Sequence, residues 1–105
     1  MIYLLNTPIL TTYGDFRFSG PIAPEEARRR IAPGFTSAIG HVPTATFLSA
    51  LLGMDIPAQR ATITMLPGDE ALVLRLTQRL PEGKVLNESE MAAVPYELAW
   101  LERLA

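Results

Sequence analysis

The sequence of 105 residues contains no cysteine, a single histidine and a single lysine. Without cysteine, the chain can form neither disulfides nor cysteine-ligated zinc sites, and it has no thiol nucleophile. One histidine excludes a histidine-rich metal site within one copy of the chain. We therefore expect no metal and no other cofactor.

Long apolar runs are absent as well, and the charge is nearly balanced. No run reaches the roughly 18 to 20 residues that cross a bilayer, and no charged region precedes the short apolar stretch at the start. We therefore expect a cytoplasmic protein with no membrane partner. The net charge of −2 provides no general attraction for a polyanion, so we expect no duplex nucleic acid, and any anion site must be local.

The basic side chains that are present are almost all arginines, eight of the nine. Arginine binds phosphate through two parallel hydrogen bonds, which lysine cannot do. A genome rich in G and C would produce the same bias through its codons, so the arginines alone do not identify a phosphate site.

The composition is that of one globular domain over residues 1–105, with 49% hydrophobic and 19% charged residues. So small a domain hides only about two thirds of its unfolded surface. Apolar residues also crowd segments 72–76 and 98–101. We expect a second copy to cover part of this surface, as a homodimer.

The apolar pattern predicts an α/β domain with a mixed sheet of about five strands, a central antiparallel hairpin and flanking helices. Strands are predicted over residues 2–6, 15–19, 60–66 and 71–79. Helices are predicted from Pro24 to near Pro33-Gly34, from 42 to 52 with an end at Gly53, and in a short segment that begins at Asn87. Residues 96–104 fit a helical stripe and a strand equally well.

The hairpin prediction rests on residues 67–70, which have strong turn chemistry. Pairing around this turn places Arg60 opposite Thr77 and Thr62 opposite Arg75. One face of the hairpin then forms a polar plate of Arg60, Thr62, Thr64, Arg75, Thr77 and Arg79.

A solvated outer face of the sheet would explain such a plate without any ligand. Its like charges repel one another, however, and therefore favour a bound anion or the carboxylate of Glu82 nearby.

His41 is expected at the beginning of helix 42–52, directly after Gly40. Glycine lets a ligand approach the backbone, and the helix start presents free amide groups and positive potential. These features suit a phosphate beside an imidazole. A lone histidine is more often a structural group, so the Gly-His pair alone does not establish a phosphate site.

Three segments resemble the viral anti-CRISPR ring nucleases and their bacterial relatives. They are Ile2-Tyr3-Leu4-Leu5-Asn6, Ser37-Ala38-Ile39-Gly40-His41 with Thr44, and Gln78-Arg79-Leu80-Pro81-Glu82-Gly83-Lys84. The resemblance extends over nearly the whole chain. It implies a homodimer whose two-fold axis passes through a pocket for cyclic tetra-adenylate, the second messenger of type III CRISPR systems, and it favours a strand over residues 96–104.

The resemblance also implies an activity, which is metal-independent cleavage of the ring to linear di-adenylate with a 2′,3′-cyclic phosphate. On this basis the expected catalytic residues are His41, Arg79 and Glu82, and the expected ligand-binding residues are Arg60, Arg79, Asn6, Gly40 and Thr44.

The reaction itself suggests a chemical role for each of these groups. An imidazolium at His41 would protonate the departing 5′-oxygen, and Arg60 and Arg79 would neutralise the phosphorane. Glu82 would either orient His41 or tune its protonation.

Two other hypotheses remain from the sequence. One is a protein that sequesters a cyclic nucleotide without cleaving it. The other is a protein-interaction or nucleic-acid-binding module, against which the acidic balance and the lack of an aromatic-basic strip argue.

Overall fold

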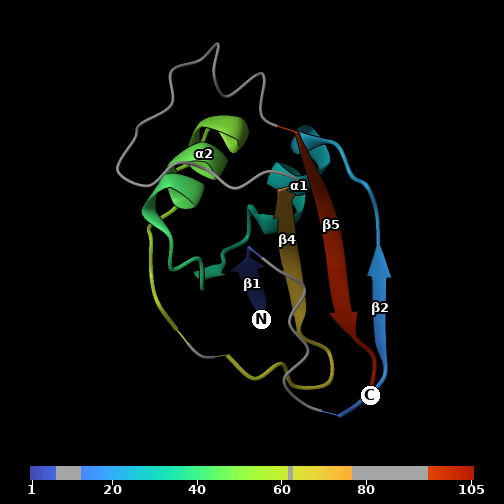
Figure 1. Ribbon diagram of the computed structural model, residues 1–105. Coiled ribbons are helices and arrows are strands. Elements are labelled where there is room, and N and C mark those ends of the chain that lie inside the picture. The colour runs from blue at the N-terminus through green and yellow to red at the C-terminus, as the bar shows by residue number, and fades with distance from the viewer. Residues whose placement is uncertain (7–12, 62, 77–94) are drawn as a thin grey trace.

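The computed structural model describes residues 1–6, 13–61, 63–76 and 95–105, which form one sheet and two helices (Figure 1). The elements in chain order are β1 (Ile2–Leu5), β2 (Phe16–Ser19), α1 (Pro24–Ile31), β3 (Thr36–Ser37), α2 (Val42–Leu52), β4 (Glu70–Leu76) and β5 (Tyr96–Arg103). The strand order in the sheet is β2-β5-β4-β1-β3.

The sheet is mixed. Strand β1 runs parallel to both β3 and β4, whereas β5 runs antiparallel to its neighbours β4 and β2. Figure 1 shows this directly, with the arrows of β1 and β2 pointing one way and that of β5 the other. The predicted α/β class and five-stranded mixed sheet are confirmed, and β3 is a two-residue strand that the sequence analysis did not predict.

Two of the three predicted helices are confirmed, and their ends follow local signals. Helix α1 begins at Pro24, with acidic residues in its first turn and Arg28, Arg29 and Arg30 in its last, as the helix dipole favours. Helix α2 ends at Gly53, which takes a left-handed conformation with φ of 65°. No helix in the described part of the chain is long and apolar enough to cross a membrane.

Each face of the sheet has its own apolar core. The helices cover one face, where a cluster includes Ile31, Leu48, Leu72, Leu74 and Trp100. The apolar core on the opposite face is smaller. There Met65 packs with the buried strand residues Leu5, Ala71, Val73 and Leu101. Because alternate side chains of a strand point to opposite faces, β4 contributes to both cores and reads as a continuous apolar run.

The predicted strand over residues 60–66, and the hairpin with it, is wrong. Of this segment, residues 60, 61 and 63–66 have no strand structure. The reason is that both edges of β4 are already bonded, one to β1 and the other to β5. Met65 and the partly buried Ile63 pack against the second face instead of extending the sheet.

The predicted polar plate is therefore not formed as a hairpin face. Arg75 lies opposite Glu97 of β5, and the two side chains approach to 4.0 Å. Arg60 is not part of a strand. Thr62, Thr77 and Arg79 lie outside the described residues, as does the helix predicted at Asn87.

The ambiguous segment near the C-terminus is strand β5. It pairs with β4 from Glu70 opposite Glu102 to Leu76 opposite Tyr96. Four consecutive residues of β5 are buried, Leu98 to Leu101. Burial on both faces removes the alternation of polar and apolar residues, so the sequence pattern did not separate strand from helix.

The predicted turn before β4 is confirmed even though its hairpin is not. The Asp69 amide donates to the Leu66 carbonyl at 2.9 Å, and Gly68 has a positive φ of 93°, as the third residue of a type II turn requires. The Leu66 amide donates in return to the Asp69 carboxylate at 2.8 Å. This hydrogen bond lowers the pKa of Asp69 below its ordinary value, and the α-amino group of Met1, 3.2 Å away, acts in the same direction.

We expect Asp69→Ala to lower the free energy of unfolding by about 1 kcal/mol at pH 7, because the Leu66 amide loses its charged acceptor. A lowered pKa in the folded state contributes stability above the ordinary carboxyl pKa, and that contribution is lost as the pH falls through the folded pKa. The difference between wild type and variant should therefore shrink below about pH 4. Urea unfolding, followed by Trp100 fluorescence at pH 7 and below about pH 4, measures this difference in the free energy of unfolding.

Asp69→Asn serves as the matched control, since it keeps an acceptor for the Leu66 amide and loses only the charge. Its destabilisation at pH 7 should be smaller than that of Asp69→Ala. A difference between wild type and Asp69→Ala that stays constant down to pH 2 would contradict the assigned role of the carboxylate.

Candidate functional site

The candidate site lies where the parallel strands end. Strands β1, β3 and β4 are parallel neighbours, so their carboxyl ends share one edge of the sheet. Asn6 is exposed directly after β1, and Gly40 and His41 follow shortly after β3. In open α/β sheets, ligands bind outside the carboxyl ends of the strands. The residues that follow β1 and β3 lie at that edge here.

His41 occupies the N-cap position of α2, and its imidazole makes no capping hydrogen bond to the helix backbone. The ring instead lies with Nδ1 3.0 Å from the hydroxyl oxygen of Thr44, whose side chain is buried. Thr44 thus fixes the ring through one nitrogen and leaves Nε2 as the ring nitrogen directed elsewhere. His41 itself is partly exposed, as a group that meets a ligand must be.

The start of α2 also carries positive potential. The first amide groups of a helix have no acceptor within the helix, and the dipole adds a partial positive charge there. Pro43 in the first turn has no N–H, which limits the free amides beyond the cap to those of Val42 and Thr44. This end of the helix can therefore attract an anion next to the His41 ring.

Arg60 reaches the same place through a segment that turns back along the helix. Helix α2 has 11 residues and is about 16 Å long. The following residues 53–60, here called the return segment, can extend to about 26 Å, enough to lead the chain from the end of α2 back to its start. There the Gln59 amide donates to the Ile39 carbonyl at 2.8 Å.

The side chain of Arg60 lies against Gly40. A Cβ atom built on Gly40 would be 2.7 Å from the Arg60 Cγ and 3.6 Å from its Cα. Only glycine leaves room for the arginine at this distance. Arg60 is exposed, and within the described residues no carboxylate pairs with it. Its guanidinium therefore adds a positive charge beside the residue that precedes His41.

The structure brings together five of the seven predicted site residues at this sheet edge: Asn6, Gly40, His41, Thr44 and Arg60. The other two, Arg79 and Glu82, lie outside the described residues, and their roles remain predictions. In the sequence they follow the carboxyl end of β4, which is Leu76. No group of three or more His, Asp or Glu side chains that could hold a metal is found among residues 1–6, 13–61, 63–76 and 95–105.

The return segment and its anchor Ser37 were missed by the sequence analysis. Ser37 is buried and donates a hydrogen bond to the Pro57 carbonyl at 2.7 Å. A polar residue within the short, partly apolar segment 35–40 was the available signal, since a buried hydroxyl requires a partner.

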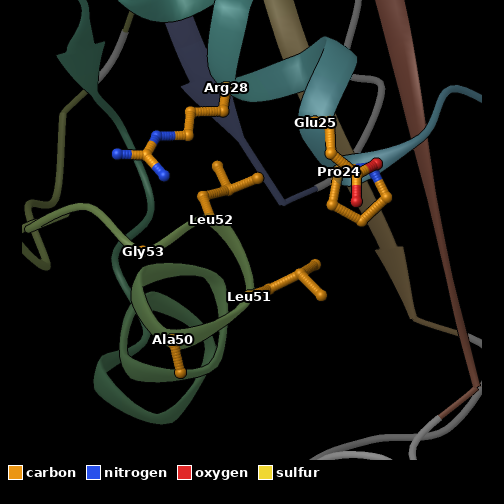
Figure 2. Close-up of a pocket in the computed structure, with 7 residues that line it drawn as sticks. All are labelled: Pro24, Glu25, Arg28, Ala50, Leu51, Leu52 and Gly53. Atoms are coloured by element: carbon orange, nitrogen blue, oxygen red, sulfur yellow. The ribbon is translucent and has the colours of Figure 1, made fainter.

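A separate cavity of about 270 Å³ lies at the far end of α2 (Figure 2). Pro24, Glu25 and Arg28 of α1 line it on one side, and the residues Ala50 to Gly53 line it on the other. Figure 2 shows the Arg28 side chain extending toward Gly53, where a terminal nitrogen lies 3.6 Å from a built Cβ. A cation there complements the carboxyl end of the α2 dipole. None of the predicted site residues lines this cavity.

Comparison with known proteins places the chain among viral and bacterial relatives. It is 38% identical to the uncharacterized protein ORF117 of Acidianus two-tailed virus, over 99% of this chain and 94% of that protein. It is 29% identical to the uncharacterized protein YddF of Bacillus subtilis, over 98% and 97% of the two chains.

The solved structure of B116 from Sulfolobus turreted icosahedral virus has the same fold, with a TM-score of 0.83 and 23% identity over 97% of this chain and 98% of that one. The model of the family described as STIV B116-like matches residues 2–98. The chain therefore belongs to the STIV B116-like family.

Proposed function

We propose that this protein is a metal-independent ring nuclease that cleaves cyclic tetra-adenylate to linear di-adenylate with a 2′,3′-cyclic phosphate, and so switches off type III CRISPR signalling. The observation that carries the proposal is the contact of the Arg60 stem with Gly40, one residue before His41 at the start of α2. A guanidinium, a helix start and an imidazole at one sheet edge suit the chemistry of a phosphodiester.

The reaction needs little covalent chemistry from the protein. The ribose 2′-oxygen attacks its neighbouring phosphorus, the bond from phosphorus to the 5′-oxygen breaks, and the 2′-hydroxyl proton passes to water. The enzyme holds the sugar in line, neutralises the phosphorane and supplies a proton to the departing 5′-oxygen. His41 as imidazolium donates that proton from Nε2, while Thr44 holds the ring through Nδ1.

Arg60 neutralises charge on the phosphorane in this mechanism, and Arg79 acts with it. Glu82 orients His41 or tunes its protonation. These assignments for Arg79 and Glu82 are supported by the resemblance of residues 78–84 to the ring-nuclease motif and by their position in the sequence after β4.

A homodimer completes the proposal. A two-fold symmetric ring would present opposite phosphates to the His41 of each copy, so that two cleavages release two identical di-adenylates. The viral members of the family support a role in countering host defence, while the bacterial relative also fits a host that ends its own signalling.

The decisive experiment incubates the protein with cyclic tetra-adenylate, or with cyclic hexa-adenylate, in excess chelator and identifies the products by chromatography. Wild type is expected to convert the tetra-adenylate to di-adenylate with a 2′,3′-cyclic phosphate. His41→Ala should lose at least about 100-fold in rate with ring affinity nearly unchanged, because proton donation acts only in the transition state.

His41→Asn is the matched control for folding, since asparagine is a favourable N-cap residue but donates no proton at this position. It should be as inactive as His41→Ala and as stable as wild type. Tight binding without cleavage by wild type would identify a sequestering protein instead, and the absence of binding would overturn both functions.

A second prediction concerns the space at Gly40. Gly40→Ala is expected to destabilise the protein by about 1 to 3 kcal/mol, because the new methyl group overlaps the Arg60 Cγ. Displacing Arg60 should also slow cleavage by about 10- to 100-fold. Thermal unfolding and the chromatographic assay measure the two effects.

In an Arg60→Ala background the overlap disappears, since the nearest remaining atom is the Cα at 3.6 Å, an ordinary contact distance. Gly40→Ala should then have little effect on the midpoint of unfolding. Equal destabilisation in both backgrounds would show that Arg60 does not fill this space.

A further inference from the structure

We propose that Ser37 is a positioning residue, whose buried hydroxyl holds the return segment so that Arg60 lies beside Gly40. This inference rests on the proposed function, because positioning is defined by the reaction that Arg60 serves. Ser37 is the last residue of β3 and is only 3% exposed. Its hydroxyl donates to the Pro57 carbonyl at 2.7 Å and accepts from the Ile39 amide at 3.4 Å.

Residues 56–60 of the return segment are attached to the fold by hydrogen bonds at three residues. The Ile56 amide donates to the Ser49 hydroxyl at 3.0 Å, next to the end of α2. Ser37 holds Pro57, and the Gln59 amide donates to the Ile39 carbonyl at 2.8 Å. These contacts follow one another along the chain as it runs from the end of α2 to the carboxyl edge of the sheet. Ser37 is the side-chain contact nearest to Arg60.

Ser37 also determines the register between the two segments. Through its two hydrogen bonds, one oxygen joins the backbone of Ile39 to that of Pro57. The bond between Ile39 and Gln59 then follows at a fixed spacing, and Arg60 is the next residue along the chain. A shift of the return segment would carry the Arg60 stem away from Gly40.

Core packing alone does not explain a hydroxyl at this position. An apolar side chain of similar size would fill a buried site without needing a partner. Pro57 is exposed, and its hydrogen bond with Ser37 is only partly buried. The hydrogen bond from Ser37 to Pro57 therefore serves mainly to order the return segment, and not to provide a partner for a polar group inside the apolar core.

The test combines Ser37→Ala with Arg60→Ala in a double-mutant cycle. Ser37→Ala alone should slow cleavage of cyclic tetra-adenylate by about tenfold, because a misplaced group loses much of its effect. In the Arg60→Ala background, the same change should slow cleavage by less than about twofold, since no arginine remains to be positioned. A residue that only stabilises the fold would slow cleavage equally in both backgrounds.

Ser49→Ala is the matched control, because it removes a hydroxyl of α2 that binds the return segment at Ile56, one residue before the Ser37 contact and farther along the chain from Arg60. It should lower the midpoint of thermal unfolding by a few degrees, as Ser37→Ala does, and change the cleavage rate by less than about twofold. Ser37→Thr keeps the hydroxyl and should retain the rate within about threefold, even where its added methyl group lowers the midpoint.

A readout without substrate separates this inference from the proposed function. In the ligand-free protein, Ser37→Ala should accelerate hydrogen exchange of the Gln59 amide by about tenfold, and Ser49→Ala should not, as measured by NMR. Unchanged exchange at Gln59, or multiplicative effects of Ser37→Ala and Arg60→Ala on cleavage, would overturn the positioning role. A wild type that does not cleave refutes the nuclease proposal, and Gln59 exchange then decides whether Ser37 places Arg60.

Discussion

Strand β1 bonds to β3 along one edge and to β4 along the other, and this double parallel pairing determines where the residues of the candidate site meet. Parallel neighbours end at the same edge of a sheet, so the segments that leave them start close together. Asn6 leaves β1 there, and Gly40 and His41 leave β3 there. The return segment adds Arg60 from the opposite direction. Groups separated by up to 54 positions in the chain thus share one sheet edge without any local sequence signal that joins them.

Local chemistry allowed the helices to be predicted, and through them the position of His41. For α2, its apolar side chains and Gly53 at its end are signals within the segment itself. Residues 67–70 likewise form the predicted turn. What the turn could not reveal was the partner of β4, because that depends on two strands far away in the sequence. The hairpin prediction failed for this reason, and the expected cross-strand partner of Arg75 was wrong as well, since that partner is Glu97.

The candidate site was predicted in part, and for reasons that were only partly right. Arg60 was expected near His41 as a member of a strand, whereas it lies beside Gly40 at the end of the irregular return segment. Its anchors are a buried serine and backbone hydrogen bonds, which hydrophobic periodicity does not reveal. The contact of Thr44 with the His41 ring follows from a spacing of three residues on a helix start, a relation that the sequence does contain.

The imidazole of His41 makes no capping bond to the helix it precedes. Helix α2 is held instead by its buried face and by Gly53, so the helix does not rely on a capping side chain at position 41. In the proposed mechanism, a single substitution at position 41 would therefore turn a nuclease into a binding protein while helix α2 stays in place. Within such a family, the chemistry at this one position would vary more readily than the shape that surrounds it.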